Sequence, residues 1–82
     1  MKTLSPELKE FICEIISSQS INQIEKVIRN DDNCTASDYF RTGVNLVQVE
    51  YRLRLMNGES KYIQMLGEIC AFIRSIDELL QE

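Results

Sequence analysis

The sequence predicts an all-α fold, a small four-helix domain whose long C-terminal helix packs antiparallel to the third helix. Apolar residues recur at helical spacing in four stretches, approximately 5–17, 20–30, 36–56 and 60–81. Residues that can cap a helix stand at the start of each stretch. At 82 residues, the chain has the length of a single domain, 1–82.

The first helix is expected to start at the Ser-Pro-Glu sequence of residues 5–7. Ser can cap a helix, Pro fits the first turn, and Glu favours the positive end of the helix dipole. Its apolar face comprises Leu8, Phe11, Ile12 and Ile15. The polar sequence Ser-Ser-Gln at 17–19 is expected to break this helix.

The second helix is expected to start at a capping box in residues 20–23, Ser-Ile-Asn-Gln. Its apolar face comprises Ile21, Ile24, Val27 and Ile28. The polar run Asn-Asp-Asp-Asn at 30–33 is typical of a turn and is expected to end the helix.

The third stretch supports two interpretations. Apolar and polar residues alternate over 47–55, which is a strand pattern, but a lone strand would need a partner strand from another molecule. As a helix, capped by Thr35 or Ser37, the stretch has two apolar faces. One face comprises Phe40, Val44, Val47, Tyr51 and Leu55, and the opposite face comprises Leu46, Val49, Leu53 and Met56. We prefer a helix that is buried on both sides.

The last helix is expected to follow a turn at Asn57-Gly58, in which Gly supplies a left-handed residue, and to be capped by Ser60. A heptad seam runs along it through Tyr62, Leu66, Ile69, Ile73, Ile76 and Leu80, and Met65, Phe72 and Leu79 widen the seam. Such a helix either packs within one chain or pairs with a second chain. Because the seam offers more apolar length than the two short helices can cover, we expect a homodimer. Its self-association residues would be Leu66, Ile69, Ile73, Ile76 and Leu80.

Composition excludes several classes of function. The net charge is −4, from nine basic and thirteen acidic residues that never form a basic cluster, so direct nucleic-acid binding is disfavoured. The chain has no His, which removes the usual general base and the commonest zinc ligand. We therefore expect no enzyme activity, no metal and no cofactor. No apolar run suits a signal peptide or a bilayer span, so we expect a cytoplasmic protein without membrane binding.

The three cysteines have no metal-binding or disulfide spacing, and we expect reduced thiols. Cys13 and Cys70 lie in apolar helical patterns, where burial is expected. Cys34 lies in a polar turn and is the candidate for a reactive thiol.

Residues 10–56 resemble the Hha/YmoA family of small enterobacterial modulators. The resemblance starts with Glu-Phe-Ile at 10–12, aligns without gaps over Gln19 to Ile28, and includes Ser37-Asp38. Residues 50–53, Glu-Tyr-Arg-Leu, match the family's Asp-His-Arg-x motif, with Tyr51 in place of His. After Met56 the chain continues into the heptad helix instead of the family's Pro-x-x-x-Trp ending.

The resemblance implies a helical module that binds the N-terminal dimerisation region of the nucleoid protein H-NS, largely through charged contacts, and tunes gene silencing without reading DNA itself. It implies partner-binding roles for Glu50 and Arg52. A second resemblance, over residues 44–80, is to the small helical-hairpin chaperones of type III secretion subunits. The alternative functions are therefore a chaperone of this kind or a phage-encoded inhibitor that binds a host protein.

Overall fold

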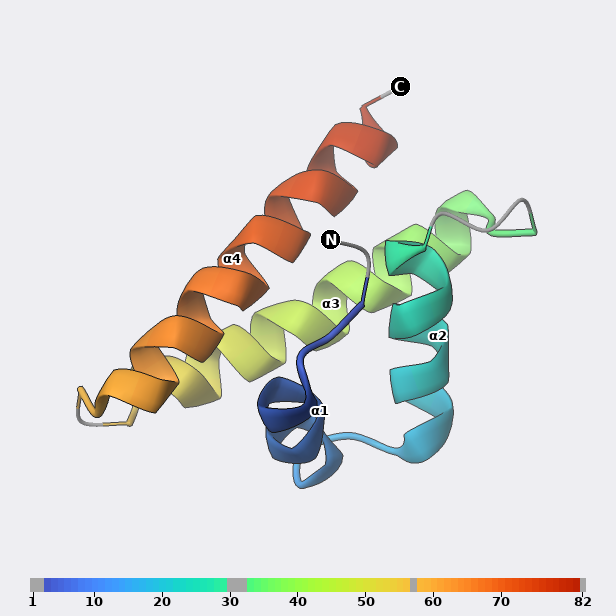
Figure 1. The fold of residues 1–82 in the computed structure, drawn as a ribbon. Helices are drawn as coiled ribbons and strands as arrows, with labels where there is room; N and C mark the ends of the chain where they lie inside the picture. The colour runs from blue at the N-terminus through green and yellow to red at the C-terminus, as the bar shows by residue number, and fades with distance from the viewer. Residues whose placement is uncertain (1–2, 30–32, 57, 82) are drawn as a thin grey trace.

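Four α-helices make up the fold, and the described part of the chain contains no strand. The computed structural model describes residues 3–29, 33–56 and 58–81. The helices are α1 (Pro6–Cys13), α2 (Ser18–Ile28), α3 (Ala36–Arg54) and α4 (Ser60–Leu80). The long α3 and α4 form an antiparallel hairpin, and this pair shares the most extensive contact of any two helices (Figure 1). The predicted all-α fold is confirmed, and the strand pattern at 47–55 belongs to a helix.

The end of the first helix and the start of the second differ from the prediction. Ser5 caps α1 as expected, and its Oγ accepts a hydrogen bond from the N–H of Leu8 at 3.3 Å. However, α1 ends at Cys13, and the N–H groups of both Ile15 and Ile16 then bond the carbonyl of Ile12 in a tight turn. Ser17 therefore becomes the N-cap of α2, with its Oγ accepting from the N–H of Ser20 at 3.2 Å. The predicted capping box at 20–23 is wrong, because the residues expected to break the first helix begin the second.

The caps of the long helices correct one prediction and settle another. Thr35, not Ser37, caps α3 in a reciprocal capping box: Thr35 Oγ1 accepts from the N–H of Asp38, and Asp38 Oδ2 accepts from the N–H of Thr35 at 2.8 Å. The N-cap of α4 is Glu59, whose side chain makes no capping bond, so the predicted Ser60 cap is wrong. Gly58 has the expected left-handed backbone, with φ of +77°. Asn57 and residues 30–32 of the predicted turn cluster lie outside the described residues.

The core lies on the inner side of the α3·α4 hairpin, where α1 and α2 cover it. The innermost side chains are Leu8, Ile12, Ile24, Val27, Leu46, Val49 and Ile69. Polar ties hold the short helices in place: Lys9 of α1 pairs with Glu25 of α2 at 3.2 Å, and the N–H of Ser5 bonds Glu68 of α4 at 2.9 Å. Burial of this apolar set is the main source of stability in such a small domain.

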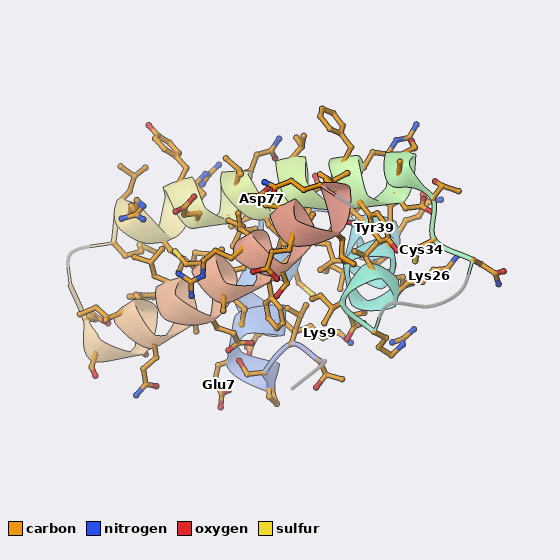
Figure 2. All side chains as sticks on the ribbon, turned by 90° about the horizontal axis from the view of Figure 1, so that it is seen from above. Glu7, Lys9, Lys26, Cys34, Tyr39 and Asp77 are labelled. Carbon is orange, nitrogen blue, oxygen red and sulfur yellow. The ribbon has the colours of Figure 1, made fainter. Side chains whose placement is uncertain are left out.

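The expectation that the third helix is buried on both sides is wrong. Leu46, Val49 and Leu53 lie in the core, whereas Met56 at the end of the same face is 38% exposed. The opposite face points away from the other three helices, as the outward side chains of the yellow-green α3 show in Figure 2. The physical reason is that α1, α2 and α4 all pack on one side of α3, and the described chain has no further helix to cover the other side.

The heptad seam of α4 is largely used within one chain. Ile69 and Ile76 are buried, together with Met65 and Phe72, so these residues are not available to a second copy in this fold. Leu66 and Ile73 are half-buried, and Leu80 is 42% exposed. Of the five residues expected at a homodimer interface, three therefore remain accessible.

Candidate protein-interaction surface

The largest set of exposed apolar side chains on a single helix lies on the outer face of α3. We call this set the α3 outer stripe; it comprises Phe40, Val44, Val47, Tyr51 and Leu55, the last being the C-cap residue of the helix. Their separations of three and four positions bring all five onto one side of a helix. The side chains are between 43% and 64% exposed.

Exposure of this kind favours a binding function over a structural one. Single apolar residues at a surface are ordinary, but a contiguous row rimmed by polar residues is typical of an interaction site. Phe40 and Tyr51 are the largest members, and aromatic residues are enriched among the anchors of protein interfaces. The stripe therefore has the composition and shape of a docking surface for another protein.

A shallow hollow of about 490 Å³ lies beside the N-terminal half of the stripe, between α2 and α3. Its walls combine two members of the stripe with polar side chains and one arginine; the lining residues are Gln19, Ser20, Gln23, Phe40, Arg41, Val44 and Asn45. Gln23 is held in place because its Nε2 donates a hydrogen bond to Oδ1 of Asp38 at 3.1 Å. This hollow offers hydrogen-bonding groups next to apolar ones.

A second hollow, of about 200 Å³, lies beside the C-terminal end of the stripe, where α3 approaches α1. It is lined by Phe11, Glu14, Ile15, Arg52, Leu55 and Met56. Phe11 packs against Tyr62 of α4, with the two ring centroids 5.9 Å apart. Each end of the stripe thus adjoins a hollow that contains an arginine.

Glu50 and Arg52, the residues expected to bind a partner, are not brought together by the fold. Glu50 faces α4: its Oε2 accepts from Nη2 of Arg54 at 2.9 Å and from Sγ of Cys70 at 3.6 Å. The hydrogen bond and charge of Glu50 raise the pKa of Arg54 above its usual value. Arg52 is exposed on the other flank of α3, in the hollow beside α1. Arg52 is therefore free to face a partner, whereas Glu50 is engaged within the chain.

The capping box at the start of α3 carries a perturbed carboxylate. The pKa of Asp38 is lowered, chiefly by the hydrogen bond from the backbone N–H of Thr35 and further by the side chains of Thr35 and Gln23. Because Gln23 belongs to α2, this carboxylate also links the two helices that border the larger hollow. Asp38 is committed to these bonds and is a structural residue of the surface.

The thiols are distributed differently from the sequence prediction. Cys13 is exposed, not buried, because it is the last residue of a helix that is shorter than predicted. Cys70 is half-buried against Glu50. Cys34 is half-buried, and its Sγ lies 3.7 Å from the carbonyl oxygen of Lys26, next to which it is seen in Figure 2. Within residues 3–29, 33–56 and 58–81, no group of three or more metal-ligating side chains comes together.

The comparisons with known proteins give no relative to set beside this geometry. No family model matches the chain, and no curated protein or solved structure matches it significantly. Among the described residues, none of the helices combines the length and the apolar character that a membrane span requires.

The sequence identifies the outer stripe as an apolar face and predicts that it is buried, whereas the structure exposes it. Its composition contains a signal that separates it from the truly buried face. The buried face is aliphatic over Leu46, Val49 and Leu53, whereas the stripe includes the aromatic residues Phe40 and Tyr51. Aromatic residues and arginines are both enriched at protein interfaces.

Proposed function

We propose that this protein is a non-catalytic protein–protein interaction module that docks its partner on the α3 outer stripe. The observation that carries the proposal is the row of five large apolar side chains, each at least 43% exposed, on one helix. Fully burying an exposed large apolar side chain contributes about 1.5–3 kcal/mol. The side chains of the stripe are roughly half exposed, so covering each one contributes about half of that amount, and covering several gives a partner substantial binding energy.

For the partner, we propose an H-NS-type nucleoid protein, whose silencing activity the module tunes in the cytoplasm. The support is the Hha/YmoA resemblance of residues 10–56, which span the second half of α1 and all of α2 and α3, the helices that form the stripe and its two hollows. The net charge of −4 fits a protein that reaches DNA through its partner instead of binding it directly. Arg52, exposed beside the stripe, is the proposed charged contact.

The alternative function is that of a small helical chaperone for a type III secretion subunit. The observation in its favour is the antiparallel α3·α4 hairpin, which includes the residues of the second resemblance, 44–80. A phage-encoded inhibitor of a host protein would use the same surface. These alternatives differ in the identity of the partner, so binding measurements separate them.

Electrophoretic mobility shifts with duplex DNA and purified H-NS test the proposal. We expect no shift by this protein alone at physiological salt and a supershift of the H-NS–DNA complex. Val47→Asp should abolish the supershift, because it places a charge in the middle of the stripe, and Arg52→Glu should weaken it. Ala71→Asp, a change from an apolar to an acidic side chain at an exposed position of α4, is the control. Binding of DNA without H-NS at sub-micromolar concentration would contradict the proposal, and capture of a secretion subunit with indifference to H-NS would favour the chaperone.

Self-association is a separate part of the proposal. With Ile69 and Ile76 buried, a homodimer through α4 rests on Leu66, Ile73 and Leu80. Sedimentation equilibrium should show a dimer at micromolar concentration that Leu80→Asp dissociates. A monomer at about 100 µM, roughly a hundredfold above a Kd near 1 µM, would mean that no homodimer forms.

A further inference from the structure

Three arginines border the α3 outer stripe. Arg41 and Arg52 are eleven positions apart, which is close to three helical turns, so they lie on the same flank of α3 about 16 Å apart. Arg54 lies on the opposite flank, in a third hollow that it shares with Tyr62 and Ile63 of α4. Because Arg54 is paired with Glu50 at 2.9 Å, the arginines that can meet carboxylates of a partner are Arg41 beside the N-terminal half of the stripe and Arg52 beside its C-terminal half.

This basic border contrasts with the rest of the molecule. Helix α3 contains three basic and two acidic residues, so it carries +1, while the remainder of the chain carries −5. Both acidic side chains of α3 are engaged: Asp38 in the capping box and Glu50 with Arg54. The local charge of the docking surface is thus opposite in sign to the charge of the protein.

The hollow that contains Arg41 and the hollow that contains Arg52 differ in whether a carboxylate lines them. No acidic residue lines the hollow of Arg41, whose other polar residues are amides and a hydroxyl. Glu14 of α1 lines the hollow of Arg52 and shares it with that guanidinium. An acidic side chain of a partner is therefore favoured most strongly at Arg41.

We propose that the stripe docks an amphipathic helix whose apolar face is bordered by Asp or Glu side chains, two of them about three turns apart. This inference rests on the proposed function and specifies the chemistry of the partner. A helix fits because the stripe is a straight row over fifteen positions, about 22 Å, with the three- and four-residue spacing that packs against a second helix. Carboxylates on its border match the arginines, which bind them through two N–H groups at once.

A second copy of this chain is a less suitable occupant. In an antiparallel dimer centred between Val47 and Gln48, Phe40 would lie on Leu55 of the other copy, which is a favourable apolar contact. However, the same register places Arg41 beside Arg52 of the other copy, and two-fold symmetry repeats this contact between like charges. Charge complementarity therefore selects an acidic helix over this arrangement.

Fluorescence anisotropy with two designed peptides tests the proposal on the full chain. The probes are fluorescein-labelled, lactam-bridged helices of about 18 residues, with Leu on the apolar face and either Glu or Lys at every bordering position. We expect the Glu peptide to bind about tenfold more tightly at low salt, and the difference to shrink as salt screens the charges. Glu14→Gln should strengthen binding of the Glu peptide, because it removes a competing carboxylate.

Charge-reversal variants provide the decisive comparison. Arg41→Glu combined with Arg52→Glu should remove or reverse the preference for the Glu peptide. Arg74→Glu, a single charge reversal at an exposed position of α4, should leave the preference intact. Val47→Asp should weaken binding of both peptides, whereas Ala71→Asp, at an exposed position of α4, should weaken neither. Circular dichroism establishes that each variant is folded. Equal affinity for the two peptides, including no binding of either at 100 µM, would overturn the proposal, as would a dimer in solution that Val47→Asp dissociates.

The outcomes separate this inference from the proposed function. If the variants alter peptide preference as expected but H-NS does not bind, the acidic-helix surface stands and the nucleoid partner is wrong. If H-NS binds through the stripe, as shown by loss of binding in Val47→Asp, but neither peptide is preferred, the proposed function stands and the acidic helix is wrong.

Discussion

The backbone N–H of Ser5 donates a hydrogen bond of 2.9 Å to Oε2 of Glu68, which lies 63 positions later in α4. Ser5 is the N-cap of α1, so a carboxylate from the C-terminal helix satisfies one of the free N–H groups at the start of the first. In a capping box, an acidic residue within the same helix makes this bond. The contact fastens α1 to α4. It thereby holds in position Phe11 of α1, which lines the hollow that contains Arg52.

Removing this tie should destabilise the protein. We expect Glu68→Ala to lower the free energy of unfolding by about 1–2 kcal/mol, because the N–H of Ser5 loses a charged acceptor. Glu68→Gln keeps an uncharged acceptor, so it should lower the free energy of unfolding by less. Urea denaturation measures both, with Asp77→Ala, an exposed change on the same helix, as the reference. Equal stability of Glu68→Ala and Asp77→Ala would show that the tie contributes nothing.

Adjacent residues of α3 should respond in opposite ways to truncation. Leu46 is fully buried and Val47 is 50% exposed. Leu46→Ala should cost about 2–5 kcal/mol through lost burial and a cavity, whereas Val47→Ala should change stability by no more than about 0.5 kcal/mol. Thermal and urea unfolding of the two variants check the assignment of the two faces. A larger loss for Val47→Ala than for Leu46→Ala would mean that α3 packs through its other face.

Substituting Thr42 of α3 and Thr35 at its N-cap should change the free energy of unfolding in opposite directions. Thr42 is fully buried, and its Oγ1 has no hydrogen-bond partner among the described residues. Thr42→Val keeps the shape and removes the unsatisfied hydroxyl, so we expect the free energy of unfolding to rise by about 1 kcal/mol. Thr35→Val removes the N-cap acceptor and should lower it by about 1 kcal/mol. Denaturation midpoints decide, and a destabilised Thr42→Val would indicate that the hydroxyl is bonded.

Stability should depend on pH through Asp38. Its pKa in the folded chain is lowered from the usual 3.8, mainly by the backbone N–H of Thr35. A lowered folded pKa means that the stabilisation is present above pH 3.8 and is lost as the pH falls through the folded pKa. The Asp38→Asn variant should therefore show a smaller loss of stability over this interval than the wild type. Identical pH profiles from urea denaturation between pH 5 and 2 would contradict this role.

The local structure was largely predictable, and the errors lie at helix ends. The caps at Ser5 and Thr35 follow from side chains that bond N–H groups within their own turn, which is information carried by neighbouring residues. The predicted cap of α2 is wrong because Ser17 and Ser20 can both cap a helix, and the choice depends on where α1 ends. The Glu68 tie to Ser5 has no counterpart in local sequence at all.

For the candidate site, apolar periodicity alone establishes that α3 has two apolar faces. It could not establish which face is buried, because both have the same helical spacing and similar length. Packing made that choice: α1, α2 and α4 converge on Leu46, Val49 and Leu53, and no described helix remains to cover Phe40 and Tyr51. Periodicity is a property of one helix, whereas burial depends on how much apolar surface the other helices can bring to it.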